Sequence, residues 1–279
     1  MSDPFVTTGW LAQHLGDPAV AIVDGSWYLP HMNRDPRAEY LAGHIPGAVF
    51  YDVDTMADTS LGLPHMLQKP AEFARTAGAL GIGDGMRIVV YDGDGLFSAP
   101  RVRWNFVTMG AGDVVILEGG LPKWKAEGRP LQSGEASPEP KAFTPRYNPA
   151  AVADLEAVRS WTNEGGRLVV DARPAPRFRG EAPEPRPGLK SGHMPGAKSM
   201  PAMSLTENGR LKPAAALRAQ FAEAGIDLTK PLATTCGSGV TAATLKLALE
   251  QAGAKDVVLY DGAWAEWGGR DDTTVVKGP

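Results

Sequence analysis

The stretch Gly-His-Ile-Pro-Gly-Ala at residues 43–48 recurs as Gly-His-Met-Pro-Gly-Ala at residues 192–197. Five of the six residues are identical, and the two stretches lie 149 residues apart in a chain of 279. A second match keeps the same order, because Val-Asp at residues 23–24 returns at residues 170–171, 147 residues later. A period of half the chain is typical of a duplicated domain and is far longer than the unit of a solenoid.

We therefore predict two domains of the same build, an N-terminal one at residues 1–127 and a C-terminal one at residues 151–279. The segment between them, residues 128–150, contains five prolines among serine, glycine and glutamate residues. This composition is typical of an extended linker.

Within each copy, short β-branched runs alternate with helical patterns. The expected strands are residues 21–24, 87–92, 113–117, 167–171, 232–235 and 256–260. Pro70 and Pro213 suit the first turn of a helix, and Gly81 and Gly225 suit its end. This alternation predicts the α/β class, with two tandem domains that each hold a parallel sheet flanked by helices. In such sheets, ligands bind beyond the carboxyl ends of the strands.

Composition excludes several classes of function. The formal net charge is -4 and the basic residues form no block, so we expect no nucleic-acid partner. No stretch reaches the roughly 18 apolar residues of a membrane span, and residues 1–10 lack the pattern of a secretory leader, so we expect a cytoplasmic protein without a membrane partner. Cys236 is the single cysteine, which rules out an internal disulfide and leaves a thiolate zinc site without its usual partners. No metal or organic cofactor is implied.

Cys236 follows the apolar run 232–235 and precedes Gly237-Ser238-Gly239, after which a helical pattern begins. Two glycines in this turn allow several backbone N–H groups to converge at the start of a helix, which makes a cradle for an anion. Such a cradle stabilises a thiolate, the nucleophilic form of cysteine. We expect the cradle to include Gly237, Gly239, Val240 and Thr241, which would then contact the substrate. A buried cysteine on an ordinary strand-to-helix turn is the alternative.

A cysteine-dependent phosphatase uses a similar loop but needs an arginine six positions after the cysteine to hold phosphate. That position is Ala242, which disfavours a phosphatase. The first copy has Asp92 where the second has Cys236, so only the second copy is expected to be catalytic.

These features together resemble the two-domain rhodanese family of sulfurtransferases. The resemblance rests on the duplication, the paired GHIPGA and GHMPGA motifs, the aspartate in place of cysteine in the first copy, and the loop CGSGVT, and it extends from about Thr7 to Trp267. Members specialised for thiosulfate usually carry basic side chains directly after the cysteine, whereas Gly237 and Ser238 are neutral. The loop is similar to that of members that use 3-mercaptopyruvate.

The resemblance implies a transferase that moves sulfur in two steps through a persulfide on Cys236. The donor would be 3-mercaptopyruvate, which leaves as pyruvate, and the acceptor would be cyanide, a small thiol or reduced thioredoxin. Arg177 and Arg186 match the substrate-binding arginines of the family. Solvated arginines, or arginines paired with Glu181 or Glu184, are the alternative, and Arg173 is expected in an internal ion pair.

The first copy contains an insertion, since 21 residues separate Ala48 from Lys69 but only 15 separate Ala197 from Lys212. The family resemblance places two residues of this insertion, Asp54 and His65, in a proton relay with Ser238 near the sulfur. A plain surface histidine at position 65 is the alternative.

Two other functions stay open at this stage. A thiosulfate sulfurtransferase would use the same cysteine with an inorganic donor. A persulfide carrier or sensor would pass sulfur to a protein partner with little turnover of small molecules.

Overall fold

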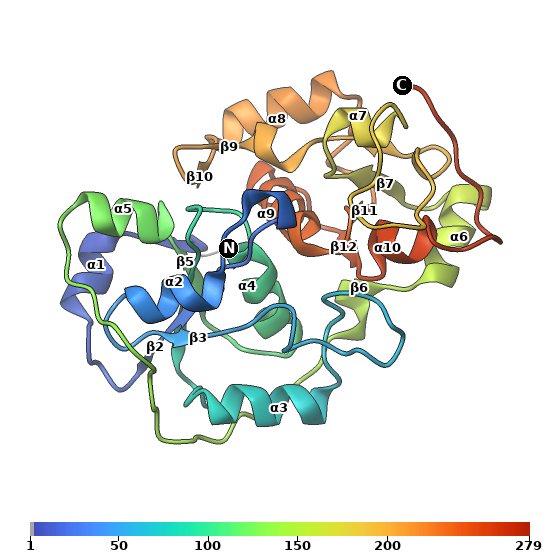
Figure 1. The fold of residues 1–279 in the computed structure, drawn as a ribbon. Helices are drawn as coiled ribbons and strands as arrows, with labels where there is room; N and C mark the ends of the chain where they lie inside the picture. Colours follow the sequence, from blue (N-terminus) through green and yellow to red (C-terminus); the bar gives the residue numbers. More distant parts are fainter. Residues whose placement is uncertain (1–2) are drawn as a thin grey trace. The chain divides into compact units, whose positions relative to one another are not determined.

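The computed structural model describes residues 3–279, which form two compact units. The first unit comprises the chain up to Ala57, Leu67–Asn148 and Asn208–Arg210. The second comprises Asp58–Met66, Pro149–Glu207 and Leu211–Pro279 (Figure 1). A short segment from the first half of the sequence, Asp58–Met66, is therefore part of the second unit.

The first unit contains a five-stranded sheet in the order β1-β5-β4-β2-β3, and every neighbouring pair is parallel. The strands are β1 (Phe5–Val6), β2 (Val20–Asp24), β3 (Val49–Phe50), β4 (Arg87–Tyr91) and β5 (Val114–Leu117). The helices are α1 (Thr8–Gln13), α2 (Pro36–Ala42), α3 (Pro70–Ala79), α4 (Ala99–Thr108) and α5 (Gly120–Ala126), with a 3-10 turn η1 at Pro30–Met32.

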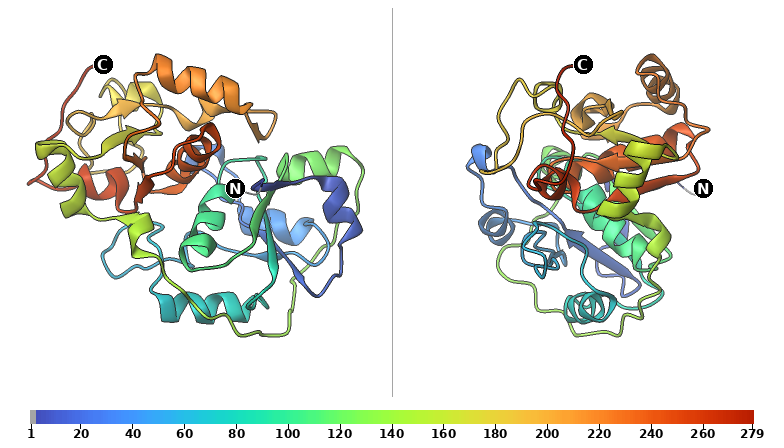
Figure 2. Two further views of the ribbon diagram at one scale, coloured as in Figure 1. Left: turned by 180° about the vertical axis from the view of Figure 1, so that it is seen from behind. Right: turned by 90° about the vertical axis from the view of Figure 1, so that its right-hand side faces the viewer.

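Helices cover both faces of this sheet (Figures 1 and 2). On one face Leu11 of α1 and Trp124 of α5 pack in a core with Val89 of β4. On the other face α3 and α4 lie together, with the rings of Phe73 and Phe106 edge to face. Because both faces are covered, the last four residues of β4 are all buried, which is why this strand has a continuous apolar sequence.

The second unit repeats the same topology, with a parallel sheet in the order β6-β12-β11-β7-β8. Its strands are β6 (Val152–Ala153), β7 (Leu168–Asp171), β8 (Lys198–Ser199), β11 (Leu232–Thr235) and β12 (Val257–Tyr260). Its helices are α6 (Leu155–Glu164), α7 (Ala175–Phe178), α8 (Ala214–Glu223), α9 (Val240–Ala252) and α10 (Ala263–Trp267), with 3-10 turns η2 (Pro149–Ala151) and η3 (Ala202–Leu205). A hairpin of β9 (Thr206–Glu207) and β10 (Arg210–Leu211) follows η3.

The predicted α/β class and parallel sheets are confirmed. The predicted strands appear within a residue of their expected bounds, but the sequence did not indicate β1, β3, β6 and β8. Each of these edge strands is two residues long, which is too short to leave a periodic pattern. Within residues 3–279, no helix is long and apolar enough to cross a membrane.

Of residues 128–150, predicted as an extended linker, residues 129–148 contain no helix and belong to the first unit, whereas Pro149 and Ala150 begin the turn η2 of the second unit. Backbone hydrogen bonds attach this segment along its length: Gln132 pairs with His44 in both directions, and Asn148 donates to Thr108. Phe143 is buried against Phe73 and Phe106. Residues 128–148 are therefore a strap bound to the first unit.

The two motif histidines have structural partners. In the first unit the His44 ring stacks on Tyr40, with Nδ1 2.8 Å from the Tyr40 carbonyl oxygen. In the second unit the His193 ring stacks on Phe178, with Nδ1 2.9 Å from the Phe178 carbonyl oxygen. Each histidine fixes the turn that precedes an edge strand.

Candidate active site

Cys236 lies directly after the central strand β11, in a turn that leads into α9. Its exposed fraction is 2%. Gly239 caps α9 with a φ of 83°, a left-handed conformation that favours glycine. The loop between strand and helix is therefore only four residues long, and it holds Cys236 close to the N-terminus of a helix of 13 residues.

The start of α10 holds the cysteine loop from one side. The backbone N–H of Trp264 donates to the Cys236 carbonyl oxygen at 2.9 Å, and that of Ala265 donates to the Gly237 carbonyl oxygen at 2.9 Å. In a planar trans peptide the C=O and the following N–H point in opposite directions. The N–H groups of Gly237 and Ser238 therefore point away from α10.

Ala263, the first residue of α10, has a φ of 52°, which is unusual for a residue with a side chain. The matching residue in the first unit is Gly120, also with a φ of 52°, and Leu121 after it donates to the Asp92 carbonyl oxygen at 3.0 Å. The same backbone support for the loop is thus present in both units. The sequence does not indicate this support, because no side chain takes part in it.

His65 and Ser238 are hydrogen-bonded in the second unit, with 2.9 Å between His65 Nδ1 and Ser238 Oγ. Both residues are buried, with exposed fractions of 4% and 5%. His65 has a φ of 63°, so its backbone is held in a sparsely populated conformation. The segment that carries it, Asp58–Met66, is closed by a hydrogen bond from Asp58 N–H to the Met66 carbonyl oxygen. A surface histidine is therefore excluded at position 65.

Asp54 belongs to the first unit, where the indole Nε1 of Trp27 donates to its Oδ1 at 3.0 Å. His65 and Ser238 both belong to the second unit, whereas Asp54 does not. The predicted role of Asp54 stays a prediction.

Arg177, at the end of α7, lies over the cysteine loop. A Cβ atom added to Gly237 would lie 3.0 Å from Nη2 of Arg177, so the guanidinium occupies the space that a larger side chain would need. Arg177 also forms an ion pair with Glu184, one of the alternatives left open by the sequence. Arg186, two residues after Glu184, is partly exposed.

Arg173 forms the expected internal ion pairs. Its guanidinium contacts Asp171 at 2.7 Å and Glu184 at 2.8 Å, and all three side chains have an exposed fraction of 1%. Burial by itself would lower the pKa of Arg173, but the two carboxylates outweigh it and the pKa is raised. The guanidinium of Arg173 is therefore charged and is neutralised by its two carboxylate partners.

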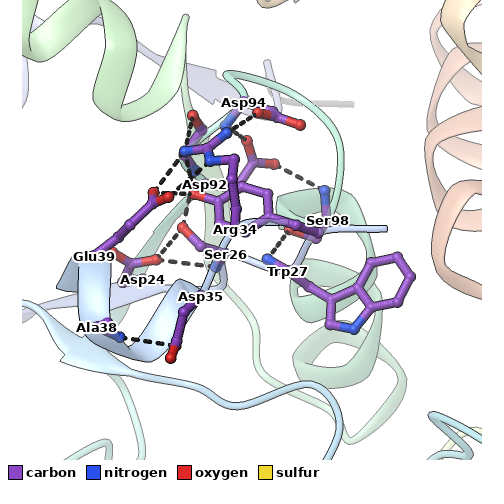
Figure 3. Close-up of polar contacts among 12 residues, drawn as sticks. Asp24, Ser26, Trp27, Arg34, Asp35, Ala38, Glu39, Asp92, Asp94 and Ser98 are labelled. Carbon is purple, nitrogen blue, oxygen red and sulfur yellow. Dashed lines mark hydrogen bonds and ion pairs between the residues drawn. The ribbon is translucent and has the colours of Figure 1, made fainter. Parts of the chain in front are cut away.

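In the corresponding turn of the first unit, the side chain of Asp92 accepts the hydrogen bonds of the surrounding backbone (Figure 3). Oδ2 of Asp92 accepts backbone hydrogen bonds from Phe97, Ser98 and Ala99 at 2.7 to 2.9 Å, and Oδ1 accepts one from Asp94. Seven residues separate Asp92 from the first residue of α4, whereas four separate Cys236 from that of α9. The longer loop of the first unit closes around the carboxylate of Asp92.

Comparison with known proteins gives consistent results. The rhodanese-like domain family matches residues 7–127 and, separately, residues 154–270. The 3-mercaptopyruvate sulfurtransferase of Escherichia coli (strain K12) is 43% identical over 272 residues, which cover 97% of each chain. The thiosulfate sulfurtransferase of Bos taurus is 42% identical over 270 residues, covering 94% of this chain and 91% of that protein. The crystal structure of SseA from Escherichia coli, described as a 3-mercaptopyruvate sulfotransferase, matches with a TM-score of 0.87 at 40% identity, covering 94% of this chain and 99% of that chain.

Proposed function

Because this chain belongs to the rhodanese family, we propose that it transfers sulfur from 3-mercaptopyruvate to a thiophilic acceptor through a persulfide on Cys236. The observation that carries the proposal is the placement of the guanidinium of Arg177 over Gly237, next to the cysteine. A 2-oxo acid with a thiol on its third carbon presents a carboxylate and a sulfur, and this site presents an arginine and a cysteine to match them.

In the first step the Cys236 thiolate attacks the thiol sulfur of 3-mercaptopyruvate. The new S–S bond forms as the C–S bond breaks, and the electron pair of the broken bond leaves on carbon as the enolate of pyruvate. The enolate takes up the proton of the former thiol and becomes pyruvate, and an anionic persulfide stays on Cys236. Ser238, hydrogen-bonded to His65, is the group proposed to relay this proton, and the family resemblance adds Asp54 as the group that orients His65.

In the second step an acceptor removes the outer sulfur and restores the thiolate. Cyanide gives thiocyanate, a small thiol gives a hydropersulfide, and reduced thioredoxin gives sulfide and its own disulfide. We propose the cytoplasm as the compartment, where thiols and thioredoxin are kept reduced.

Several groups are proposed to hold the donor. Arg177 and Arg186 would bind the carboxylate and the carbonyl oxygen. The backbone N–H groups of Gly237, Gly239, Val240 and Thr241 would stabilise the negative charge on sulfur and on the departing enolate. The hydrogen bond from α10 to the Cys236 carbonyl oxygen supports the assignment of Gly237, because it turns the N–H of Gly237 away from α10.

Thiosulfate is the second candidate donor, since a relative at 42% identity is named for it. A basic side chain at position 237 would have to displace Arg177 from its place over the loop. The glycine at this position therefore favours a donor that needs Arg177 where it is, and a carboxylate donor meets that requirement.

The proposal is tested by intact-protein mass spectrometry after brief incubation with 3-mercaptopyruvate or with thiosulfate, with pyruvate assayed in the same tube. We expect a gain of one sulfur atom, faster with 3-mercaptopyruvate and matched by pyruvate. Cys236→Ser is the matched control, because it is close to isosteric, and it should gain no sulfur while retaining its fold. Faster gain with thiosulfate would favour the inorganic donor, and no gain with either donor would favour a carrier loaded by a protein partner.

A further inference from the structure

Glu184 is a buried carboxylate placed between two guanidinium groups. Its Oε1 accepts from Arg173 Nη1 at 2.8 Å and from Arg177 Nε at 3.3 Å, and its Oε2 accepts from Arg177 Nη2 at 2.5 Å. The side chain of Glu184 has an exposed fraction of 1%, and that of Arg177 17%. The carboxylate thus binds one edge of Arg177, the edge formed by Nε and Nη2.

Arg173 prevents Glu184 from moving. Its guanidinium donates to both carboxylate oxygens of Asp171 and, at 2.8 Å, to the Gly192 carbonyl oxygen. It also lies 4.0 Å from the centre of the Trp264 ring. The backbone N–H of Trp264 binds the cysteine loop, so the anchor of Glu184 and the support of Cys236 share one residue.

Glu184 contacts Nε and Nη2 of Arg177 but not Nη1. Nη1 makes no hydrogen bond with any residue that the structure describes in the second unit, although Nη2 of the same group lies beside Gly237. Because a guanidinium is planar, fixing the Nε and Nη2 edge also fixes the direction in which Nη1 points.

The first unit contains the same arrangement of a glutamate and an arginine, and there a second carboxylate contacts the arginine (Figure 3). Glu39 binds Arg34 through Nε at 2.8 Å and Nη2 at 2.6 Å, and Nη2 lies 3.3 Å from the position of a Cβ atom on Gly93. Nη1 of Arg34 contacts a carboxylate oxygen of Asp94 at 2.5 Å. Asp94 stands two residues after Asp92, as Ser238 stands two residues after Cys236. The first unit therefore shows where an arginine held in this way places an anion relative to the loop.

We propose that Glu184 is a positioning residue, which holds Arg177 so that Nη1 receives the carboxylate of the sulfur donor beside residue 238. This inference rests on the proposed function for the identity of the donor, but the orientation of Arg177 concerns any carboxylate that approaches Cys236. The recognised group is a carboxylate, and the position is the one that Asp94 occupies in the first unit.

The test compares the alkylation of Cys236 by iodoacetate, which carries a carboxylate, with that by iodoacetamide, its neutral analogue. The chain has one cysteine, so the rate of alkylation reports a single site. The rate ratio of the two reagents, divided by the ratio for a free thiol, measures carboxylate recognition without any need for turnover. A failure of the proposed function would appear as no turnover of 3-mercaptopyruvate, and it would leave this ratio measurable.

We expect Glu184→Gln to lower the ratio about tenfold while the iodoacetamide rate stays within about twofold. In steady state the KM for 3-mercaptopyruvate should rise about tenfold, with a smaller change in kcat. Glu181→Gln is the matched control, because Glu181 pairs with the exposed Arg179 in the same segment, and it should keep the ratio of the wild type.

Glu184→Asp provides a second variant in case removal of the charge beside Arg173 prevents folding. It retains the carboxylate that Arg173 requires but shortens its reach toward Arg177, and it should also lower the ratio. A wild-type ratio in a folded Glu184 variant would overturn the proposal. So would an equal loss of rate with both reagents, which would indicate a structural role only.

Discussion

Asp92 and Cys236 occupy matching positions at the carboxyl end of the central strand in the two units, and they differ in what the turn around them binds. The carboxylate of Asp92 accepts four backbone N–H groups from its own loop. Cys236 begins a shorter loop whose carbonyl groups are bound to α10, which leaves N–H groups available on the other side. The residue type and the length of the loop thus both distinguish a turn that binds its own carboxylate from a turn that holds a thiol.

The hydrogen bond between His65 and Ser238 leads to a prediction at this scale. Replacing Ser238 with alanine removes the hydroxyl that the proposed relay needs, and general acid or base groups contribute about 100-fold or more. We expect kcat with 3-mercaptopyruvate to fall by about that factor, while the free energy of unfolding changes by about 1 kcal/mol, the value of one hydrogen bond. Steady-state kinetics and urea unfolding measure the two quantities. A kcat within twofold of the wild type would exclude Ser238 from the relay.

Asp24 leads to a prediction about pH. Burial raises the pKa of Asp24 to about 6, against the lowering effect of hydrogen bonds from Ser26, and Asp92 nearby adds to the rise. The folded protein therefore binds more protons at this site than the unfolded chain between about pH 4 and 6. The stability that the neutral carboxyl contributes is present below this range and is lost as the pH rises through it.

The measurement is the free energy of unfolding as a function of pH, for the wild type and for Asp24→Asn. A shift of this size corresponds to about 3 kcal/mol. We expect the difference between wild type and variant to change by an amount of that order between pH 4 and 7, with the variant gaining relative to the wild type as the pH rises. A constant difference across the range would show that folding does not raise the pKa of Asp24.

At the scale of elements, the junction between β5 and α5 supports the Asp92 turn in the way that the start of α10 supports the Cys236 turn. Gly120 has a φ of 52°, and an added Cβ would meet the Asp92 carbonyl oxygen at 2.5 Å and Cα of Gly95 at 2.9 Å. Both obstacles are backbone atoms, which cannot rotate away. This glycine is required by space as well as by its conformation.

Gly120→Ala is therefore expected to destabilise the protein by more than about 2 kcal/mol, because strain and collision add. Gly47→Ala is the matched control, since Gly47 has a φ of 78° but open space around its Cα. There we expect about 1 kcal/mol from the left-handed conformation alone. Equal losses of stability in urea unfolding would mean that the backbone at Gly120 does not lie this close to the backbone of Asp92 and Gly95.

At the scale of the whole molecule, each unit includes a segment that lies outside its own copy of the repeated sequence. The strap closes the aromatic core of the first unit, where Phe143 packs against Phe73 and Phe106. The segment Asp58–Met66 brings His65 to Ser238, although 173 residues separate them in sequence. A duplicated fold has in this way acquired segments that only one copy needs.

The strap gives a prediction of its own. Phe143→Ala removes a buried ring from the first unit and should cost about 3 to 5 kcal/mol in the unfolding of that unit. Because Phe143 and Cys236 belong to different units, the iodoacetamide rate of Cys236 in the folded variant should stay near the wild-type value. A loss below about 1 kcal/mol would mean that the strap is bound to the first unit only weakly.

By itself, the sequence was sufficient for the duplication, the α/β class, the strand before Cys236, the aspartate in the first copy and the ion pair of Arg173. These features depend on local patterns, since burial on both faces of a sheet makes strands apolar and tight turns select glycine. The role of Arg177 in binding the substrate was predicted through the family resemblance.

The family resemblance placed His65 with Ser238, and only the tertiary structure decided between that contact and a surface histidine. Only the tertiary structure decided that Glu184 binds both Arg173 and Arg177, and that the start of α10 supports the cysteine loop. His65 lies in an irregular segment, which carries no periodic pattern that would indicate its partner. Glu184 was one of several acidic residues that could pair with these arginines, and the support from α10 is made by backbone groups that any residue possesses. Contacts of these kinds depend on how distant segments pack, and no local pattern in the sequence encodes that packing.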